Sequence, residues 1–383
     1  MRRRLAVITE IIAPYRIPVF NALAKEPDIE LKVIFLAEND PGLRKWLVYK
    51  NEMEFPYQVL SSRRMRLAGR SLILHWGLTT ALGEFAPEAI ICGGYNDVAD
   101  WQAWLWARRR KLPFLVWVES NGSDRRAGIA VFESLKKRFL AGSTGVVVPG
   151  RASTTYAASL GVRDDSVFIA PNAVDNELFG KRALQERSQA ESQRLALGLP
   201  ERYFLFVGRL IREKGVFDLI EAYAGLSPDI RKKIGLVLVG DGRERAELEK
   251  AARVVSPGKI IFRGFVQRDR LVTDYALAEV FVFPTHSDAW GLSVNEAMAC
   301  GLPVIVADVA GCAGDLVEDG CNGRIVASGN PQQLGRAMAE MAVDAEGRAA
   351  MGKRSLEIIA NYSAQRCASG LADAARSVWD SHV

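Results

Sequence analysis

Two cations in the second half of the chain are placed to bind a phosphate group. Gly208 opens a turn in 206-FVGRLIREKGVFDLI-220, Arg209 and Lys214 bracket it, and a helix is predicted to begin near Gly215. Free backbone N–H groups at a helix start favour an anion. Arg offers a planar fork to phosphate oxygens, and Lys offers a mobile point charge. The turn therefore predicts phosphate binding; the alternative is that both cations are solvated loop residues.

Two carboxylates, Asp288 and Glu296, lie eight residues apart in 285-THSDAWGLSVNEAMACGLPVI-305. Glu296 can accept hydrogen bonds from two vicinal hydroxyls of a ribose, because both carboxylate oxygens accept. Gly291 relieves the steric limits on the turn, so that backbone N–H groups can point at a phosphate. Asp288 would be costly to bury unpaired, so we expect a polar ligand or nearby N–H groups beside it. The alternative for Glu296 is a capping box that begins at Ser293.

The elements that must position these residues are short apolar runs that alternate with helical patterns. Strands that are apolar on both faces and alternate with helices predict parallel sheets covered on two sides. Ligands of such sheets gather at the carboxyl ends of the strands, so we expect two α/β sheets in tandem with a site between them. The predicted strands are 5–9, 31–36, 89–92, 114–118 and 145–149, followed by 202–208, 236–240, 259–262, 279–284 and 303–308.

The domain boundaries follow from this order of elements. We predict a first Rossmann-like domain over 1–172 and a second Rossmann-like domain over 173–363. Residues 364–383 are predicted to form a closing helix that packs back on the first domain. The polar segment 180–202 has no strand signal, and we interpret it as a linker or a loop near a hinge.

Composition excludes several classes of protein. The chain has 383 residues, which is too long for one ordinary core, and no run approaches the ~18–20 apolar residues of a membrane span. The N-terminal apolar run is interrupted by Glu10, so we interpret it as a first strand and expect a cytoplasmic protein. Five scattered cysteines and three histidines favour reduced thiols and make a metal site based on histidine improbable.

Positive charge is concentrated in the first part of the chain. Residues 1–170 hold 24 Lys and Arg against 17 Asp and Glu, a net charge of +7, whereas the remainder carries −2. The clusters are RRR at the start, RRMRLAGR at 63–70, RRRK at 108–111 and KKR at 136–138. They are interpreted either as solvated surface or as a face that meets anionic lipid or a phosphate-bearing acceptor. Nucleic acid is not expected, because no binding motif accompanies them.

Two motifs in the second half of the chain resemble those of a known family. FVGRLIREKG together with DAWGLSVNEAMACGLPVIVADVAG resembles the retaining glycosyltransferases of family 4, whose GT-B fold has two Rossmann-like domains facing across a cleft. The resemblance implies transfer of a sugar from a nucleoside diphosphate donor with retention, usually without a metal, so no cofactor is expected. It assigns phosphate binding to Arg209 and Lys214, ribose binding to Glu296, a base contact to the backbone of Val266, and phosphate and sugar contacts to the amides of Gly291 and Leu292.

The sequence departs from the family pattern in three places. Asp288 replaces the first Glu of E-x7-E and is shorter by about one C–C bond, ~1.5 Å, so we expect activity with altered positioning of the donor sugar. Arg16, in 12-IAPYR-16, stands where a glycine pair is usual, as a phosphate contact or as a surface residue at a helix start. Glu119, in 117-WVESNG-122, stands where a histidine is usual. The resemblance implies that domain 1–172 binds the acceptor and domain 173–363 binds the nucleotide sugar. Arg16 and Glu119 are therefore the acceptor-side candidates.

The expected function is a retaining glycosyltransferase that acts on a hydroxyl of a glycan, glycolipid or lipid-linked acceptor in cell-surface polysaccharide or glycoconjugate synthesis. We expect it in the cytoplasm, with the inner face of the membrane as a possible peripheral site. The alternatives are a non-catalytic sugar-nucleotide-binding subunit and a GT-B sugar-nucleotide epimerase. His286 can reach the same region, although a lone histidine in such a loop is usually structural. Trp101, Trp104 and Leu105 have helical spacing and are interpreted as core packing, with membrane docking as the alternative.

Overall fold

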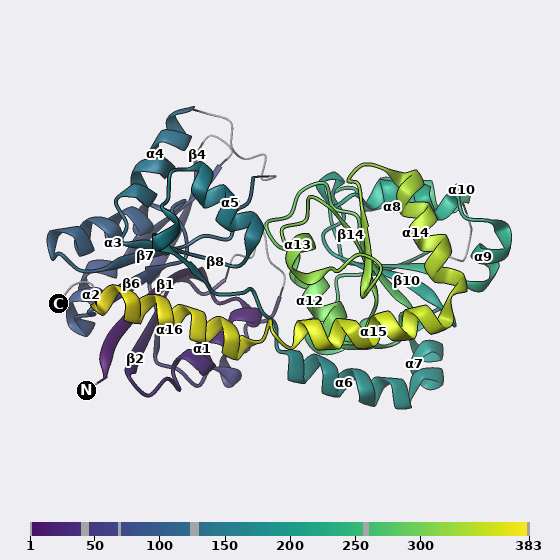
Figure 1. The fold of residues 1–383 in the computed structure, drawn as a ribbon, viewed down its shortest axis with the longest axis horizontal. Helices are drawn as coiled ribbons and strands as arrows, with labels where there is room; N and C mark the ends of the chain where they lie inside the picture. Colours follow the sequence, from purple (N-terminus) through teal and green to yellow (C-terminus); the bar gives the residue numbers. More distant parts are fainter. Residues whose placement is uncertain (1, 40–45, 68–69, 123–129, 256–259, 381–383) are drawn as a thin grey trace. The chain divides into compact units, whose positions relative to one another are not determined.

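The structure is a computed structural model that describes residues 2–39, 46–67, 70–122, 130–255 and 260–380. It divides into two compact units (Figure 1). The first unit is Met1–Ala173 together with Ser363–Val383, and the second is Val174–Tyr362. The boundaries predicted from the sequence, after residues 172 and 363, each lie one residue from these.

The first unit is built on a seven-stranded parallel sheet with the order β3-β2-β1-β6-β7-β8-β9. A separate antiparallel pair, β4 and β5, follows β3 in the chain. The strands are β1 (Arg3–Ile11), β2 (Ile29–Ala37), β3 (Tyr57–Val59), β4 (Ser61–Leu67), β5 (Arg70–Trp76), β6 (Ala89–Cys92), β7 (Phe114–Trp117), β8 (Gly145–Val148) and β9 (Val167–Ile169). The helices are α1 (Ile17–Leu23), α2 (Leu78–Phe85), α3 (Val98–Arg109), α4 (Ala130–Ala141), α5 (Arg151–Ser159) and α16 (Ala364–Asp380).

Alternate residues of β1 belong to different hydrophobic cores, because successive side chains of a strand point to opposite faces. Leu5 and Val7 pack into the core that includes α1 and α16, whereas Ala6 and Ile8 pack into the core under α2 and α3. Figure 1 shows α16, in yellow, beside α1. Arg376 of α16 binds Glu26 and Asp28, so the C-terminal helix is also held to the first unit by charge.

The second unit repeats this plan with a six-stranded parallel sheet in the order β12-β11-β10-β13-β14-β15. Its strands are β10 (Tyr203–Val207), β11 (Gly235–Val239), β12 (Ile260–Gly264), β13 (Val280–Phe283), β14 (Val304–Ala307) and β15 (Gly323–Val326). Its helices are α6 (Asn176–Ser188), α7 (Ala190–Leu197), α8 (Val216–Ala224), α9 (Pro228–Lys233), α10 (Arg245–Val255), α11 (Arg268–Ala276), α12 (Leu292–Ala299), α13 (Ala313–Leu316), α14 (Pro331–Val343) and α15 (Ala345–Ile359).

Both sheets reverse their strand order at one point, between β1 and β6 in the first and between β10 and β13 in the second. Loops that leave neighbouring strands at such a switch point diverge to opposite faces and leave room for a ligand beyond the carboxyl ends. The predicted fold class, α/β with two Rossmann-like parallel sheets, is confirmed. Each of the ten predicted strands overlaps an observed strand.

The prediction of a linker at 180–202 is wrong, because most of this segment is helical. Asp175 caps α6 by accepting a hydrogen bond from the Leu178 N–H at 2.9 Å. Phe179 and Ala183 are the only residues of α6 that are buried, and they are spaced one turn apart. A stripe of two apolar residues is too narrow to stand out from a polar sequence. The contacts that stabilise α6 are tertiary, with α11 and α12.

Candidate active site

The turn after β10 leaves the sheet at the switch point. The Gly208 N–H donates to the Val239 carbonyl at 3.0 Å, and the Leu210 N–H donates to the Asp241 carbonyl at 3.0 Å. These bonds tie the turn to the loop after β11. Between them, Arg209 is exposed at the carboxyl end of the sheet. The pKa of Glu213 is lowered by a hydrogen bond from its own backbone, by the charge of Arg243 and, to a smaller extent, by the charge of Arg209.

Two glycines of the loop after β11 were not selected from the sequence. A Cβ on Gly240 would lie 1.8 Å from the Gly208 carbonyl oxygen, and one on Gly242 would lie 2.2 Å from the Leu210 carbonyl oxygen. Only glycine allows the two loops to approach so closely. The signal was present in 240-GDG-242, which directly follows a predicted strand.

The helix predicted to begin near Gly215 is α8, which starts immediately after it. Gly215 has a φ of 67°, and a Cβ there would lie 1.8 Å from the Pro284 carbonyl oxygen. The start of α8 is therefore pressed against the end of β13. This close packing brings Lys214 to the loop that carries Asp288.

Lys214 and Asp288 form an ion pair. The side chains are 12% and 23% exposed, so the pair is largely but not fully removed from water. The Lys214 Nζ also donates to the Ser287 carbonyl at 3.3 Å, and Asp288 Oδ1 accepts from the Trp290 N–H at 3.1 Å. The partner that we expected for Asp288 is thus supplied by the protein, in part by another of the predicted site residues.

Trp290 is a further residue that sequence reasoning missed. It is 3% exposed, and its indole N–H donates to the Asn295 side-chain oxygen at 2.8 Å. Since its backbone N–H holds Asp288, Trp290 anchors the Asp288 loop to the first turns of α12. A tryptophan between Ala289 and Gly291 carried no signal of this role.

Gly291 ends this loop with a φ of 105° and precedes Leu292, the first residue of α12. A Cβ at Gly291 would lie 2.8 Å from the Phe283 ring. The capping-box alternative is wrong, because the N-cap position is occupied by Gly291 and no side chain caps α12. Ser293 instead lies within the helix.

Glu296 lies in the second turn of α12 and is bound by Tyr275 of α11. The Tyr275 hydroxyl donates to Glu296 Oε2 at 2.7 Å. Burial raises the pKa of Glu296 to about 7, although the Tyr275 hydrogen bond and the charge of Arg268 act in the opposite direction. The carboxylate therefore changes its protonation state near neutral pH. Tyr275 was not selected from the sequence, where it reads as one more apolar position of a helix.

Val266 is partly buried in the loop between β12 and α11. It follows the strand two places from β10 in the sheet, so its backbone lies at the same carboxyl edge as Gly208. The second unit thus gathers the predicted donor-binding residues along one edge of one sheet.

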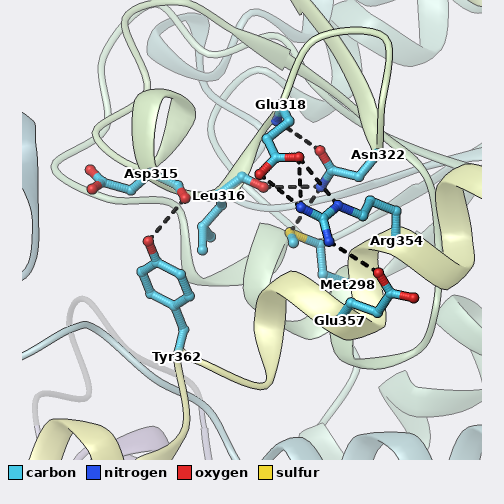
Figure 2. Close-up of polar contacts among 8 residues, drawn as sticks. All are labelled: Met298, Asp315, Leu316, Glu318, Asn322, Arg354, Glu357 and Tyr362. Carbon is cyan, nitrogen blue, oxygen red and sulfur yellow. Dashed lines mark hydrogen bonds and ion pairs between the residues drawn. The ribbon is translucent and has the colours of Figure 1, made fainter.

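A polar network joins Met298 of α12 to the segment between β14 and β15 and to α15 (Figure 2). The buried Asn322 side chain donates to the Leu316 carbonyl at 3.0 Å and contacts the Met298 sulfur at 4.0 Å. Arg354 of α15 binds Glu318 at 3.0 Å and Glu357 at 3.0 Å. These contacts fix the segment between β14 and β15 against α12 and α15, so we interpret the network as structural.

The acceptor-side candidates lie in the first unit, where they contact each other. Arg16 Nη2 donates to Glu119 Oε1 at 2.8 Å, and Nη1 donates to the Thr9 hydroxyl at 2.6 Å. The guanidinium lies 4.4 Å from the centre of the Trp117 ring. Burial disfavours the charged guanidinium, but Glu119 and Tyr15 outweigh this and raise the pKa of Arg16.

Arg16 is 9% exposed, so the alternative of a surface residue at a helix start is wrong. The Glu119 side chain is 28% exposed. Of the two, Glu119 has the more exposed side chain, and the ion pair with Arg16 fixes its orientation.

The structure also gives the surroundings of His286 and of the apolar residues of α3. His286 lies 2.8 Å from Asp218 Oδ2 at the surface, which agrees with a structural role. Trp101 and Trp104 pack edge-to-face with centroids 5.9 Å apart and join the core under α3, as predicted. Leu105, in contrast, is 44% exposed and lies outside that core.

Within the described parts of the chain, no group of three or more His, Cys, Asp or Glu side chains is arranged to hold a metal ion. None of the described helices has the length and apolarity that a membrane span requires.

Comparison with known proteins identifies a family and several relatives of this chain. The model of the family "Glycosyl transferases group 1" matches residues 188–357. D-inositol 3-phosphate glycosyltransferase 2 of Catenulispora acidiphila is 30% identical over 327 residues, which cover 78% of this chain and 75% of the relative. Sulfoquinovosyl transferase SQD2 of Arabidopsis thaliana is 33% identical over 192 residues, which cover 49% of this chain and 36% of the relative. This chain likewise spans only 50% and 52% of the lengths of two other relatives.

Similar solved structures extend over nearly the whole chain. The crystal structure of Anabaena Alr3699/HepE in complex with UDP and glucose has a TM-score of 0.76 and is 18% identical, and the match covers 98% of this chain and 100% of that one. At this identity the likeness shows a shared fold.

Proposed function

Since the chain belongs to the glycosyl transferases group 1 family, we propose that it transfers a sugar from a nucleoside diphosphate donor to a hydroxyl group, with retention of the anomeric configuration. The observation that carries this proposal is the grouping of Lys214, Asp288 and Glu296 at the switch point of the second sheet. The names of the relatives support sugar transfer, and the HepE complex with UDP and glucose supports a nucleotide-sugar donor.

The proposed binding mode divides the donor among three groups. Glu296 takes the ribose hydroxyls, and the backbone of Val266 takes the base. Lys214 and Arg209 take the diphosphate, together with the backbone N–H groups at the starts of α8 and α12. Lys214 is bound to Asp288 in the free protein, so the diphosphate must compete for a cation that already has an anionic partner. Asp288 then becomes available to the hydroxyls of the donor sugar.

The chemical step requires the bond between the sugar and the diphosphate to weaken as negative charge grows on the departing oxygen. Lys214 and Arg209 stabilise that charge where it develops, and removing one such group costs on the order of 10²-fold in rate. In the proposed mechanism the acceptor hydroxyl attacks from the face that the diphosphate leaves, and a departing phosphate oxygen takes its proton. No separate general base is needed.

On the acceptor side, we propose that Glu119 accepts a hydrogen bond from an acceptor hydroxyl while Arg16 holds it in place. The positive charge of residues 1–170 favours a phosphate-bearing or lipid-linked acceptor. Such acceptors belong to the synthesis of cell-surface polysaccharides and glycoconjugates.

The donor is identified by the thermal stability of the protein with UDP-, GDP-, ADP- and dTDP-sugars. A ligand at 100 times its Kd adds about 2.7 kcal/mol of stability. The selected donor is then incubated with and without acceptor, in the presence and absence of EDTA. We expect turnover that requires the acceptor and is unchanged by EDTA. Binding without turnover would indicate a non-catalytic subunit, and release of altered free sugar would indicate an epimerase.

Variants test the assigned roles. Glu296→Ala is expected to raise the donor KM strongly, whereas Asp288→Ala is expected to lower kcat. The double variant Arg209→Ala, Lys214→Ala should lose activity by more than ~10²-fold. Arg212→Ala is the matched control, because Arg212 lies in the same turn but is exposed and binds Glu247 at 3.0 Å. Normal activity of the double variant would contradict the proposal.

A further inference from the structure

Tyr275 brings a hydroxyl group into the site from a fully buried position. Its ring is 0% exposed and lies between Phe179 and Phe281, at centroid distances of 6.2 and 5.7 Å. The hydroxyl has one partner among the described contacts, Glu296 Oε2 at 2.7 Å. Burial and the neighbouring Glu296 charge both raise the pKa of Tyr275 well above its usual value. The phenol therefore keeps its proton, and it is the donor in this hydrogen bond whenever Glu296 is ionised.

The two oxygens of Glu296 consequently differ. Oε2 accepts a hydrogen bond from Tyr275. Oε1 has no hydrogen-bond partner among the described residues, and it is not among the side-chain atoms that are both buried and unpaired. A carboxylate oxygen has two lone pairs and can accept from two donors. One oxygen is thus sufficient for two vicinal hydroxyls.

We propose that Tyr275 is a positioning residue for donor binding: by holding Oε2, it makes Oε1 of Glu296 the oxygen that receives the ribose hydroxyls. The inference rests on the proposed function and deepens it. It replaces the expectation that both oxygens of Glu296 are open to the ribose. It also gives Tyr275 a second effect, because a hydrogen bond to an ionised carboxylate stabilises the charged form that the hydroxyls need.

The charged and titratable groups near Glu296 come from three helices. Arg268 and Tyr275 approach from α11, Cys300 follows the last turn of α12, and Arg187 of α6 donates to the Cys300 carbonyl. Arg268 and Tyr275 both favour the carboxylate. Burial raises the pKa of the Cys300 thiol well above its usual value, so of these groups only Glu296 changes charge across the neutral range.

The test is the pH dependence of nucleotide binding to the full chain, with UDP and GDP as probes. Affinity should rise with pH as Glu296 ionises, with a midpoint near 7. Tyr275→Phe should move the midpoint upward by about one pH unit and weaken binding at pH 7 by roughly fivefold, with recovery above pH 9. The 2′,3′-dideoxy form of each probe lacks the diol and controls for titration of the phosphate.

Tyr203→Phe is the matched control. Tyr203 is also 0% exposed, and its hydroxyl donates to the Asp274 carbonyl of α11 at 2.7 Å. This variant should lower stability and leave the midpoint unchanged. If Tyr275→Phe does not fold, a fluorotyrosine at position 275 keeps the shape and, as a stronger donor, should move the midpoint downward.

The outcomes separate the inference from the proposed function. If Glu296→Gln removes the pH dependence but neither change at Tyr275 moves the midpoint, the inference is overturned and the function stands. If neither UDP, GDP nor any sugar nucleotide binds to the unmodified protein, the proposed function itself fails.

Discussion

At the scale of single residues, Glu296 combines an ionisable group with an environment that disfavours its charge. Burial raises its pKa to about 7, whereas a Glu of an unfolded chain titrates near ~4.3. Between these values the folded protein binds more protons than the unfolded chain, so this group's contribution to stability falls as pH rises from ~4.3 to about 7. The site therefore carries a stability cost at the pH where its carboxylate is ionised.

Glu296→Gln should remove this cost. We expect the Tm of the variant, relative to the unmodified protein, to increase from pH 5 to pH 8. Glu340→Gln is the control, since Glu340 is an exposed carboxylate paired with Arg324. Thermal unfolding at four pH values measures the effect. A Tm difference that stays constant across this range would show that Glu296 does not titrate as described.

The charge of Asp288 is compensated by its partners within the protein. The shorter carboxylate pairs with Lys214 and accepts the Trp290 N–H. Its charge is thus compensated before any ligand is present, which accounts for an acid in a segment that is otherwise built for burial.

At the scale of elements, the contact between α8 and β13 determines where Lys214 lies. Gly215→Ala should be strongly destabilising, because φ is 67° and the added Cβ would lie 1.8 Å from the Pro284 carbonyl oxygen. Backbone strain alone costs about 1–2 kcal/mol, and the clash adds to it. Gly198→Ala is the matched control, with a φ of 64° and no atom within 4 Å of the added Cβ.

Urea denaturation of both variants measures the difference. We expect Gly198→Ala to lose about 1–2 kcal/mol of unfolding free energy and to keep nucleotide affinity. Gly215→Ala should lose more and bind nucleotide weakly. Equal losses for the two variants would mean that the loop after β13 moves aside at little cost.

At the scale of the whole molecule, charge is distributed unequally along the chain. The cluster 108–111 at the end of α3 is exposed, and residues 1–170 carry a net charge of +7. We expect the protein to co-sediment with phosphatidylglycerol vesicles at low salt, to be released as salt screens the attraction, and not to bind phosphatidylcholine vesicles.

Replacing Arg108, Arg109, Arg110 and Lys111 with Gln should reduce this binding by roughly ten- to a hundredfold. Each cation near an anionic surface contributes ~1 kcal/mol to binding, and we expect only part of the cluster to lie that close. Lys232→Gln, Lys233→Gln is the control, since it removes cations from α9 in the second unit. Binding that is insensitive to salt and to lipid charge would contradict a membrane role for the basic clusters.

The sequence by itself determined the sheets, the loops and the residue types of the site. Apolar runs that alternate with helical patterns are local signals, and burial on both faces leaves few alternatives to a covered parallel sheet. The motifs after β10 and β13 are equally local. The helices at 176–197 escaped detection, because α6 is stabilised by packing on α11 and α12 more than by its own pattern.

Only the tertiary structure decided which side chain meets which. Lys214 and Asp288 are 74 residues apart, Arg16 and Glu119 are 103 apart, and Tyr275 and Glu296 are 21 apart. Partners at such separations are brought together by strand order and close backbone packing, which no local pattern records. For that reason the sequence indicated the charged groups of the site, whereas their pairing, orientation and protonation followed from the fold.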